Sequence, residues 1–359
     1  MMFVTGTQAD VPKNNKLSII KINELHKTKQ SNPDDDSDSD SDSDLDIDTD
    51  VDPIVTERSC THHGSINRIR TMHQNNNIIA TQSDQCKLHI YDVSTLIQSI
   101  DKSIGTTSKT IQLQPVYTQQ HSDEGYAIDW STVTRGELAT GHCNNSIHVY
   151  NMNESQHTWS MDNNKYTGHT DSVEDIQWSY SESNVFASCS VDKTIRIWDT
   201  RQYNKSAAFV VAHKTDVNVI NWNQQVQHLL ASGSDDGQLK IWDLRKFVSS
   251  QPAAAFNYHQ NAITSIEWHP LEDSVLACTS SDGQLSIWDL ALEVDADEES
   301  ALKQGADLTH ELPAQLFFIH QGQHNMKELH WNKYVENSII CTAEDGYNVL
   351  VAANMDQTI

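Results

Sequence analysis

Short runs of alternating hydrophobic and polar residues, separated by tight polar turns, recur through most of this 359-residue chain. Residues 185–190 and 194–198 are one such pair of runs, and the turn at 191–193 predicts an antiparallel hairpin between them. The strongest units share a histidine, a tryptophan nine residues later, a turn aspartate and a closing Trp-Asp pair. The three series are His169, Trp178, Asp192 and Trp198-Asp199; His213, Trp222, Asp236 and Trp242-Asp243; and His259, Trp268, Asp282 and Trp288-Asp289.

The spacing of these units, 44 to 46 residues, is typical of WD-type propeller blades, each a small antiparallel sheet of four strands. Weaker copies begin near His63, His121 and His320, which gives six readable repeats. Upstream, residues 3–7 and 17–22 predict two strands of one further blade. The prediction is therefore an all-β WD-repeat β-propeller with seven blades, of which the first is incomplete.

This organisation divides the chain into four segments within one propeller domain. We expect a partial first blade at residues 1–25 and a disordered acidic insert at 26–59. Six further blades follow at 60–359, and an acidic loop at 291–314 lies within that segment.

The histidine, aspartate and tryptophan of each strong unit are interpreted as a buried hydrogen-bonded set, completed by a serine of the preceding strand. A catalytic role is disfavoured because the same trio recurs in every strong unit, and a catalytic site rarely repeats around a ring. The sequence has no Gly-rich phosphate loop, HExxH or GxSxG motif, so we expect no enzyme activity, cofactor or metal. The proposed sets are His169, Asp192 and Trp198; His213, Asp236 and Trp242; and His259, Asp282 and Trp288.

Composition favours a nucleocytoplasmic protein. Six cysteines are scattered without a CxxC pair, which indicates reduced thiols. No stretch is long and apolar enough to span a membrane, and the N-terminus lacks the features of a signal peptide. The 18 histidines show no metal-ligand spacing, and His62-His63 is their only adjacent pair. We expect a monomer without a membrane partner.

The formal net charge is −26, and its densest part is the Asp/Ser-rich segment 34–52. Repulsion at this density prevents a core, so we expect disorder there. Two interpretations stay open: a solubility tail, or a polyanion mimic that shields a very basic client such as a ribosomal protein or histone. The segment contains Asp34, Asp35, Asp36, Asp38, Asp40, Asp42, Asp44, Asp46, Asp48, Asp50 and Asp52, and the candidate phosphosites Ser37, Ser39, Ser41 and Ser43, which precede aspartates as acidophilic kinases require.

Direct binding to nucleic acid is disfavoured, because 24 Lys and Arg stand against 50 Asp and Glu and no basic stripe is visible. A basic protein is the better partner for the rim of the ring, where the loop after each repeat histidine leads into the next strand. The candidate rim residues are Glu124, Tyr126, Asp171, Glu174, Asp216, Asp235, Lys327 and Glu328. The alternative is that these are ordinary solvated loop residues.

Several segments are more specific than the blade pattern. They are HGSINRIR (63–70), EGYAIDW (124–130), GHTDSVEDIQW (168–178), VFASCSVD (185–192), DVNVINW (216–222) and HQGQHNMKELHW (320–331). Over nearly its whole length the chain resembles the glutamate-rich WD-repeat proteins, which are ribosome-assembly WD-repeat chaperones. Its acidic segment is aspartate-rich rather than glutamate-rich, and the sequence begins after an N-terminal helix and a first blade strand that the family carries.

The resemblance implies a nuclear or nucleolar factor of 60S subunit biogenesis. The resemblance implies a dedicated chaperone whose client is the basic large-subunit ribosomal protein L three. Capture of the client in the cytoplasm is also compatible with the resemblance. Animal members of the family are linked to histones and chromatin, so histones are an alternative partner.

Two adjacent units end in WDxR motifs, Trp198 to Arg201 and Trp242 to Arg245. Paired motifs of this kind resemble those of substrate receptors of the cullin-four ubiquitin ligase, in which each arginine contacts the adaptor. The alternative, which we favour, is that Arg201 and Arg245 only continue exposed strand ends.

Overall fold

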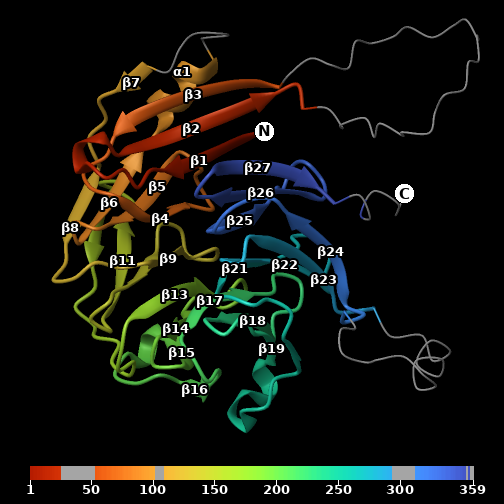
Figure 1. Cartoon of the computed structure of the whole chain (residues 1–359). Helices are drawn as coiled ribbons and strands as arrows, with labels where there is room; N and C mark the ends of the chain where they lie inside the picture. The colour runs from red at the N-terminus through yellow and green to blue at the C-terminus, as the bar shows by residue number, and fades with distance from the viewer. Residues whose placement is uncertain (26–52, 102–108, 293–311, 353–354, 356–359) are drawn as a thin grey trace, which may run out of the picture.

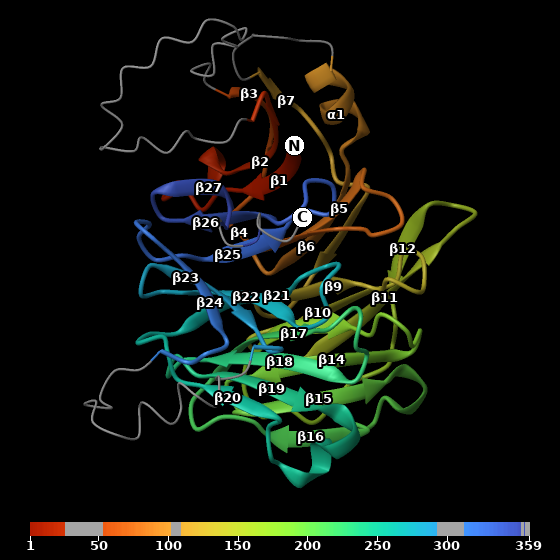
Figure 2. The ribbon, with the colours of Figure 1, turned by 90° about the vertical axis from the view of Figure 1, so that its right-hand side faces the viewer.

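The computed structural model describes residues 1–25, 53–101, 109–292, 312–352 and 355. The strands of these residues form seven small sheets, which follow one another around a ring in sequence order (Figures 1 and 2). The prediction of a seven-bladed WD-repeat propeller is confirmed. We number the blades 1 to 7 in the order of their first strands. The acidic segment 34–52, its candidate phosphosites and most of the loop 291–314 lie outside the described residues.

The first three blades have four strands each in the described structure. Blade 1 contains β1 (Met2–Gly6), β2 (Lys16–Asn23), β3 (Ile54–Thr61) and β7 (Lys109–Ile111). Blade 2 contains β4 (Ile66–Thr71), β5 (Ile78–Ser83), β6 (Lys87–Asp92) and β8 (Tyr117–Gln120). Blade 3 contains β9 (Ala127–Trp130), β10 (Leu138–Gly141), β11 (Ile147–Asn153) and β12 (Thr158–Met161).

The remaining blades follow the strong repeats. Blade 4 contains β13 (Val173–Trp178), β14 (Val185–Ser190), β15 (Thr194–Asp199) and β16 (Ala208–Val211); blade 5 contains β17 (Val217–Trp222), β18 (Leu229–Ser234), β19 (Leu239–Asp243) and β20 (Ala254–Phe256). Blade 6 contains β21 (Ile263–Trp268), β22 (Val275–Ser280), β23 (Gln284–Asp289) and β24 (Leu316–Gln321), and blade 7 contains β25 (Glu328–Trp331), β26 (Ser338–Ala343) and β27 (Gly346–Val351). The short helices are η1 (Pro12–Asn14), α1 (Ser94–Asp101), η2 (Thr200–Gln202) and η3 (Leu244–Ser249).

Blade 1 corrects two of the expected boundaries. β3 pairs with β2 along its whole length, from Lys16 opposite Thr61 to Asn23 opposite Ile54, and β7 then adds parallel to β3. Residues 54–59 are therefore a strand of blade 1 rather than part of the acidic insert, and blade 2 begins at Ile66 rather than at residue 60. The buried face of β3 includes Arg58, so its hydrophobic alternation is weak, and 30 residues separate it in sequence from its partner. The blade with three described strands is the seventh rather than the first.

The last blade meets the first at a seam between β27 and β1, which lie side by side in Figure 1. Across it the rings of Phe3 and Tyr347 lie 5.1 Å apart in an edge-on arrangement. Aromatic pairs of this geometry stabilise a contact beyond the area they bury.

The innermost strands of neighbouring blades are joined by hydrogen bonds from backbone to side chain around the central channel. In blades 3, 4 and 5 the residue just before the strand's tryptophan accepts a hydrogen bond from the tryptophan N–H of the next blade. The pairs are Asp129 with Trp178 (2.8 Å), Gln177 with Trp222, and Asn221 with Trp268 (2.9 Å). Because each acceptor is one position before a core tryptophan, one sequence position links every such blade to its successor.

The core consists of layers between adjacent blades. Ala187 and Cys189 of blade 4, for example, pack with Val217 and Ile220 of blade 5 in one apolar cluster. Trp159, the tryptophan outside the repeat positions, belongs to a similar layer: it lies against Trp130 with centroids 6.0 Å apart and donates to the carbonyl of Gly136.

Gly233 in β18 tests how tightly these layers fit. A Cβ at this position would come within 2.6 Å of Ile263 Cβ in the next blade. We expect Gly233→Ala to lower the free energy of unfolding by about 1–3 kcal/mol, measured by urea denaturation, because a packed core accommodates added volume only by distortion.

Combining Gly233→Ala with Ile263→Ala is the control, since it removes Ile263 Cγ2, the atom nearest to the new methyl group, while Ile263 Cβ stays in contact. We expect the two losses of stability to be less than additive. Strict additivity would show that the two blades do not compete for this space.

Candidate functional site: the acidic rim and the central channel

In blade 4, a histidine, a serine, an aspartate and a tryptophan form one hydrogen-bonded set. His169 Nε2 lies 2.7 Å from Ser188 Oγ, and its Nδ1 lies 2.8 Å from Asp192 Oδ2. Trp198 donates from Nε1 to the same Ser188 Oγ at 2.8 Å. Burial raises the pKa of Asp192, but the hydrogen bonds from His169 and Thr194 outweigh this and hold that pKa well below its usual range. These bonds tie the loop before β13, the β14–β15 turn and β15 together.

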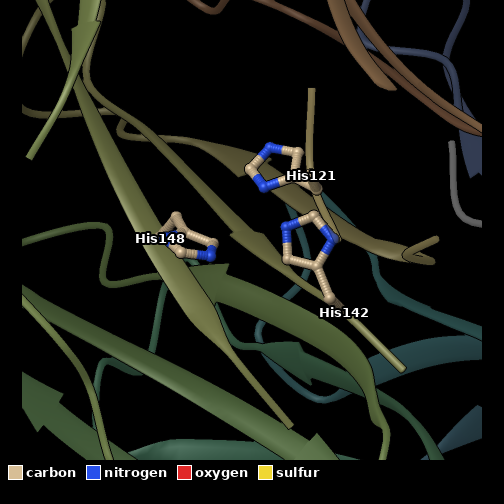
Figure 3. Close-up of side chains that lie close together, drawn as sticks. All are labelled: His121, His142 and His148. Atoms are coloured by element: carbon tan, nitrogen blue, oxygen red, sulfur yellow. The ribbon is translucent and has the colours of Figure 1, made fainter. Parts of the chain in front are cut away.

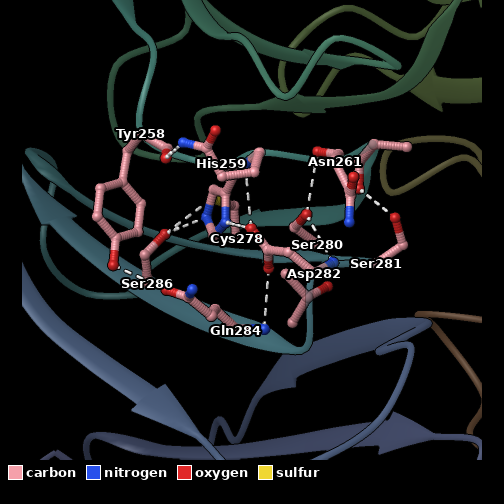
Figure 4. A network of polar contacts seen from close by, with 12 residues as sticks. Tyr258, His259, Asn261, Cys278, Ser280, Ser281, Asp282, Gln284 and Ser286 are labelled. Carbon is pink, nitrogen blue, oxygen red and sulfur yellow. Dashed lines mark hydrogen bonds and ion pairs between the residues drawn. The ribbon is translucent and has the colours of Figure 1, made fainter.

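Blades 5 and 6 vary the same arrangement. In blade 6, shown in Figure 4, His259 contacts Asp282 at 2.9 Å and Ser286 at 2.8 Å, while Cys278 occupies the position that Ser188 has in blade 4. Trp288 donates to Ser286 at 2.8 Å.

In blade 5, His213 and Trp242 both contact Ser232, at 2.7 and 2.9 Å. Asp236 accepts from Ser234 instead of binding the histidine, and burial lowers the pKa of His213 to about 3.

One end of the ring carries a rim made of tied loops. At the rim, the turn in the middle of a blade is bonded through its backbone to the loop that enters that blade's inner strand. Examples are Cys143 N to Glu124 O (2.9 Å), Val191 N to Ser172 O (3.0 Å), Asp235 N to Asp216 O (3.1 Å) and Glu344 N to His324 O (3.1 Å). Their backbones are therefore held by the blades rather than free to move as solvated loops.

Acidic side chains gather on this rim over blades 3 to 5. Asp171 and Asp235 are exposed, whereas Glu124, Tyr126, Glu174 and Asp216 are half-buried. Burial and the charge of Asp235 raise the pKa of Asp216. Burial and the charges of Asp216 and Asp175 likewise raise the pKa of Glu174, against the opposing effects of Ser172 and Arg68. The carboxylates thus repel one another, which is the field a cationic partner would relieve.

Two predicted rim residues at blade 7 behave differently from each other. Lys327 is exposed at the rim, as its place in the loop before β25 suggested. Glu328 points into the channel instead, where its Oε1 lies 2.5 Å from Arg70 and 3.7 Å from Arg68. It is therefore removed from the candidate partner surface, because its charge is already neutralised inside the ring.

Glu328 belongs to a network of charges across the channel that the sequence did not reveal. Arg68 also lies 3.9 Å from Asp175, and His330 Nδ1 lies 2.8 Å from Glu267. Burial opposes ionisation of both Glu328 and His330, yet the charge of Arg70 holds the pKa of Glu328 well below its usual range. The charge of Glu267 raises the pKa of His330 to about 9. Every second residue of an inner strand faces the channel, and Arg68 with Arg70 is the signal that would have shown this network.

The structure also brings together three histidines that sequence spacing did not connect, His121, His142 and His148 of blade 3.

The two WDxR arginines lie elsewhere, just after the C-terminal ends of β15 and β19. The side chains of Arg201 and Arg245 are both 66% exposed, and each forms a 2.7 Å ion pair with the aspartate of its own motif, Asp199 or Asp243.

The repeat pattern, the ring of sheets and the recurring polar set define a WD-repeat β-propeller. The model for "WD domain, G-beta repeat" matches residues 162–199, 204–243 and 250–289. Propellers of this class typically serve as non-enzymatic scaffolds. No helix in the described part of the chain is long and apolar enough to cross a membrane.

Three curated proteins are similar over almost the full length of the chain. "Glutamate-rich WD repeat-containing protein 1" of Dictyostelium discoideum is 53% identical over 99% of this chain and 74% of its own length. "Protein HEAT STRESS TOLERANT DWD 1" of Arabidopsis thaliana is 41% identical over 100% of this chain and 81% of its own. "Ribosome assembly protein rrb1" of Schizosaccharomyces pombe is 39% identical over 97% and 72%. The chain belongs to the family of glutamate-rich WD-repeat proteins.

The channel network predicts a specific loss of stability in alkali. An unfolded histidine has a pKa of about 6.5, so the proton that His330 retains up to about pH 9 stabilises the folded chain. This contribution is complete below about pH 6.5 and is lost as the pH rises through about 9. Because the His330 side chain is 48% exposed, we expect only about 1 kcal/mol after solvent screening.

The measurement compares urea denaturation of the wild type and of His330→Gln at pH 6.5 and pH 9.5. The wild type should lose about 1 kcal/mol more than the variant across this interval. Equal losses in the two proteins would contradict the assignment, since all other titrating groups are shared.

Proposed function

We propose that this chain is a non-enzymatic scaffold of ribosome assembly that holds a basic large-subunit ribosomal protein on its acidic rim. Membership of a family with a relative named for ribosome assembly supports the process. The observation that carries the binding surface is the set of mutually repelling carboxylates, including Glu174 and Asp216, on loops that the blades hold in place. The family resemblance suggests ribosomal protein L three as the client and the nucleus or nucleolus as the place of action.

The mechanism has an electrostatic and a structural step. The aspartate-rich segment 34–52 and the rim attract a cationic client at long range, which accelerates association and makes it sensitive to salt. The client then docks on the rim, where its lysines and arginines reduce the repulsion among carboxylates that are already partly removed from water. No cofactor or metal takes part in this step.

Charge reversal on the rim tests the proposed surface. We expect Glu174→Lys with Asp216→Lys to slow association with purified ribosomal protein L three about tenfold at physiological salt and to weaken its salt dependence. Stopped-flow or surface-based kinetics over a salt series measures both quantities.

The matched control is Glu182→Lys with Glu272→Lys, which changes the net charge equally. These two residues are exposed in the turns after β13 and β21, at the opposite end of the inner strands from the rim. If the control slows association as much as the rim variant does, capture depends on net charge alone and the rim is not the site. Core histones measured in parallel distinguish a general basic-protein chaperone from a dedicated one.

A second candidate function is that of a substrate receptor of a cullin-four ubiquitin ligase. Arg201 and Arg245 support it because they project from adjacent blades with the same exposure and the same 2.7 Å aspartate contact. If this function holds, Arg201→Ala with Arg245→Ala should abolish co-purification of the ligase adaptor while leaving thermal stability and client binding unchanged. Adaptor recovery that does not depend on the two arginines, or no recovery with the wild type, would remove this candidate.

A further inference from the structure

Blade 3 carries a cluster of three imidazoles, one from a strand, one from the turn after β10 and one from the loop that enters the blade (Figure 3). His121 follows β8, His142 follows β10, and His148 lies in β11. One ligand nitrogen from each ring lies within 4.8 Å of the others, and the ring centroids are 4.1, 5.0 and 5.3 Å apart. We propose that His121, His142 and His148 bind one transition-metal ion, with zinc(II) as the expected metal.

The repeat architecture does not require these histidines. In blade 3, His148 of β11 pairs with Thr140 of β10. In blade 4, Arg196 pairs with Ser188 in the same way, so His148 occupies the position of Arg196. The same position holds Lys240 in blade 5 and Ser286 in blade 6. The position of His142, two residues beyond Thr140, is a serine in each of these blades: Ser190, Ser234 and Ser280. The structural role common to the blades therefore does not explain a cluster of three imidazoles.

Blade 3 also lacks the acidic partner that the histidine has in blades 4 and 6. The turn position of Asp192 is taken by Asn144, whose side chain bonds to Ser122 and Ser146 instead. His121 Nε2 is 2.7 Å from the hydroxyl of Tyr150, which leaves its other nitrogen free to bind a metal. A metal-bound histidine commonly donates its second N–H to such an oxygen, which orients the ring.

His142 is the most buried of the three, with 2% of its surface exposed. Its Nε2 lies 3.1 Å from Thr140 Oγ1, and its Nδ1 has no hydrogen-bond partner among the described residues. Burial and the neighbouring histidines lower the pKa of His142 to about 2, and burial also lowers the pKa of His121 to about 4. Both rings are therefore neutral at physiological pH, which is the form that binds a metal.

These donors suit zinc better than harder cations. Neutral imidazoles favour Zn, Cu, Ni and Fe, and three of them plus a water or other oxygen complete a tetrahedral zinc site. Zn–N bonds of about 2.0–2.1 Å require nitrogens about 3.4 Å apart, so small ring rotations close the cluster. His121 and His148 are only half-buried, which leaves the fourth position open to solvent. Bound metal would fasten the loop that carries Asp123 and Glu124 to β10 and β11.

Zinc titration of the tag-free full chain against a chromophoric chelator tests the site. We expect one saturable ion per chain and a dissociation constant that rises about 100-fold in His148→Gln and in His121→Gln, since each change removes one ligand. His324→Gln is the matched control, because this side chain is 85% exposed outside the cluster. Circular dichroism confirms that each variant is folded.

Cobalt(II) substitution in the wild type provides a readout that needs no variant. A tetrahedral site with three nitrogen ligands should give intense visible absorption that stoichiometric zinc abolishes. Three results would overturn the proposal. The first is no saturable uptake of zinc at concentrations up to about 100 µM. The others are a weak octahedral cobalt spectrum and an equal loss of affinity in His324→Gln. It does not depend on the proposed function, since each readout is metal binding alone.

Discussion

The hydrogen bonds between inner strands of neighbouring blades are the constraint on which the rest of this structure depends. A four-stranded sheet of this size cannot bury both faces alone, so each blade is stable only between two others. Asp129, Gln177 and Asn221 place an acceptor where the next blade presents its tryptophan N–H. Blades 3 to 6 are therefore held at defined separations, and their rim loops inherit those positions through their backbone bonds.

The ring treats its charges in two different ways. Inside the channel, Glu328 is matched by Arg70 and Arg68, and His330 by Glu267, so the cost of removing each charge from water is offset by a partner. On the rim, burial and, to a smaller extent, neighbouring carboxylates raise the pKa values of Glu174 and Asp216. The rim rather than the channel is the proposed docking surface, because Asp171 and Asp235 are exposed there whereas Glu328 is already paired inside the ring.

The repeat signal was sufficient to predict the fold. The nine-residue interval from histidine to tryptophan and the closing Trp-Asp pair predicted blades 4, 5 and 6. Weaker copies predicted blades 2, 3 and 7, and the strand patterns at residues 3–7 and 17–22 predicted blade 1. β3 was missed because its inward positions include Arg58 and because its partner strand lies before the acidic segment. β7 was missed because it is short, pairs in parallel with β3, and lies in sequence between two strands of blade 2, β6 and β8.

Sequence reasoning was weaker for sites, because a site depends on which side chains converge. Glu328 was assigned to the rim from its place after a loop, but the strand turns its carboxylate toward Arg70. His121, His142 and His148 have no metal-ligand spacing along the chain. The pairing of β10 with β11 brings His142 close to His148, and the bond from Cys143 N to Glu124 O holds the loop that carries His121 beside them. Lys327 is exposed in the loop before β25, as its charge and its place beside the strand suggested.

The most direct test of the proposed function is a tagged pull-down from cell extract, with bound proteins identified by mass spectrometry, for the full chain and for a chain lacking residues 34–52. An acidic chaperone should recover one free large-subunit ribosomal protein in nearly stoichiometric amount, and the deletion should reduce that recovery. Recovery mainly of histones or of a ligase adaptor, unchanged by the deletion, would contradict the account and leave the acidic segment as a solubility tail.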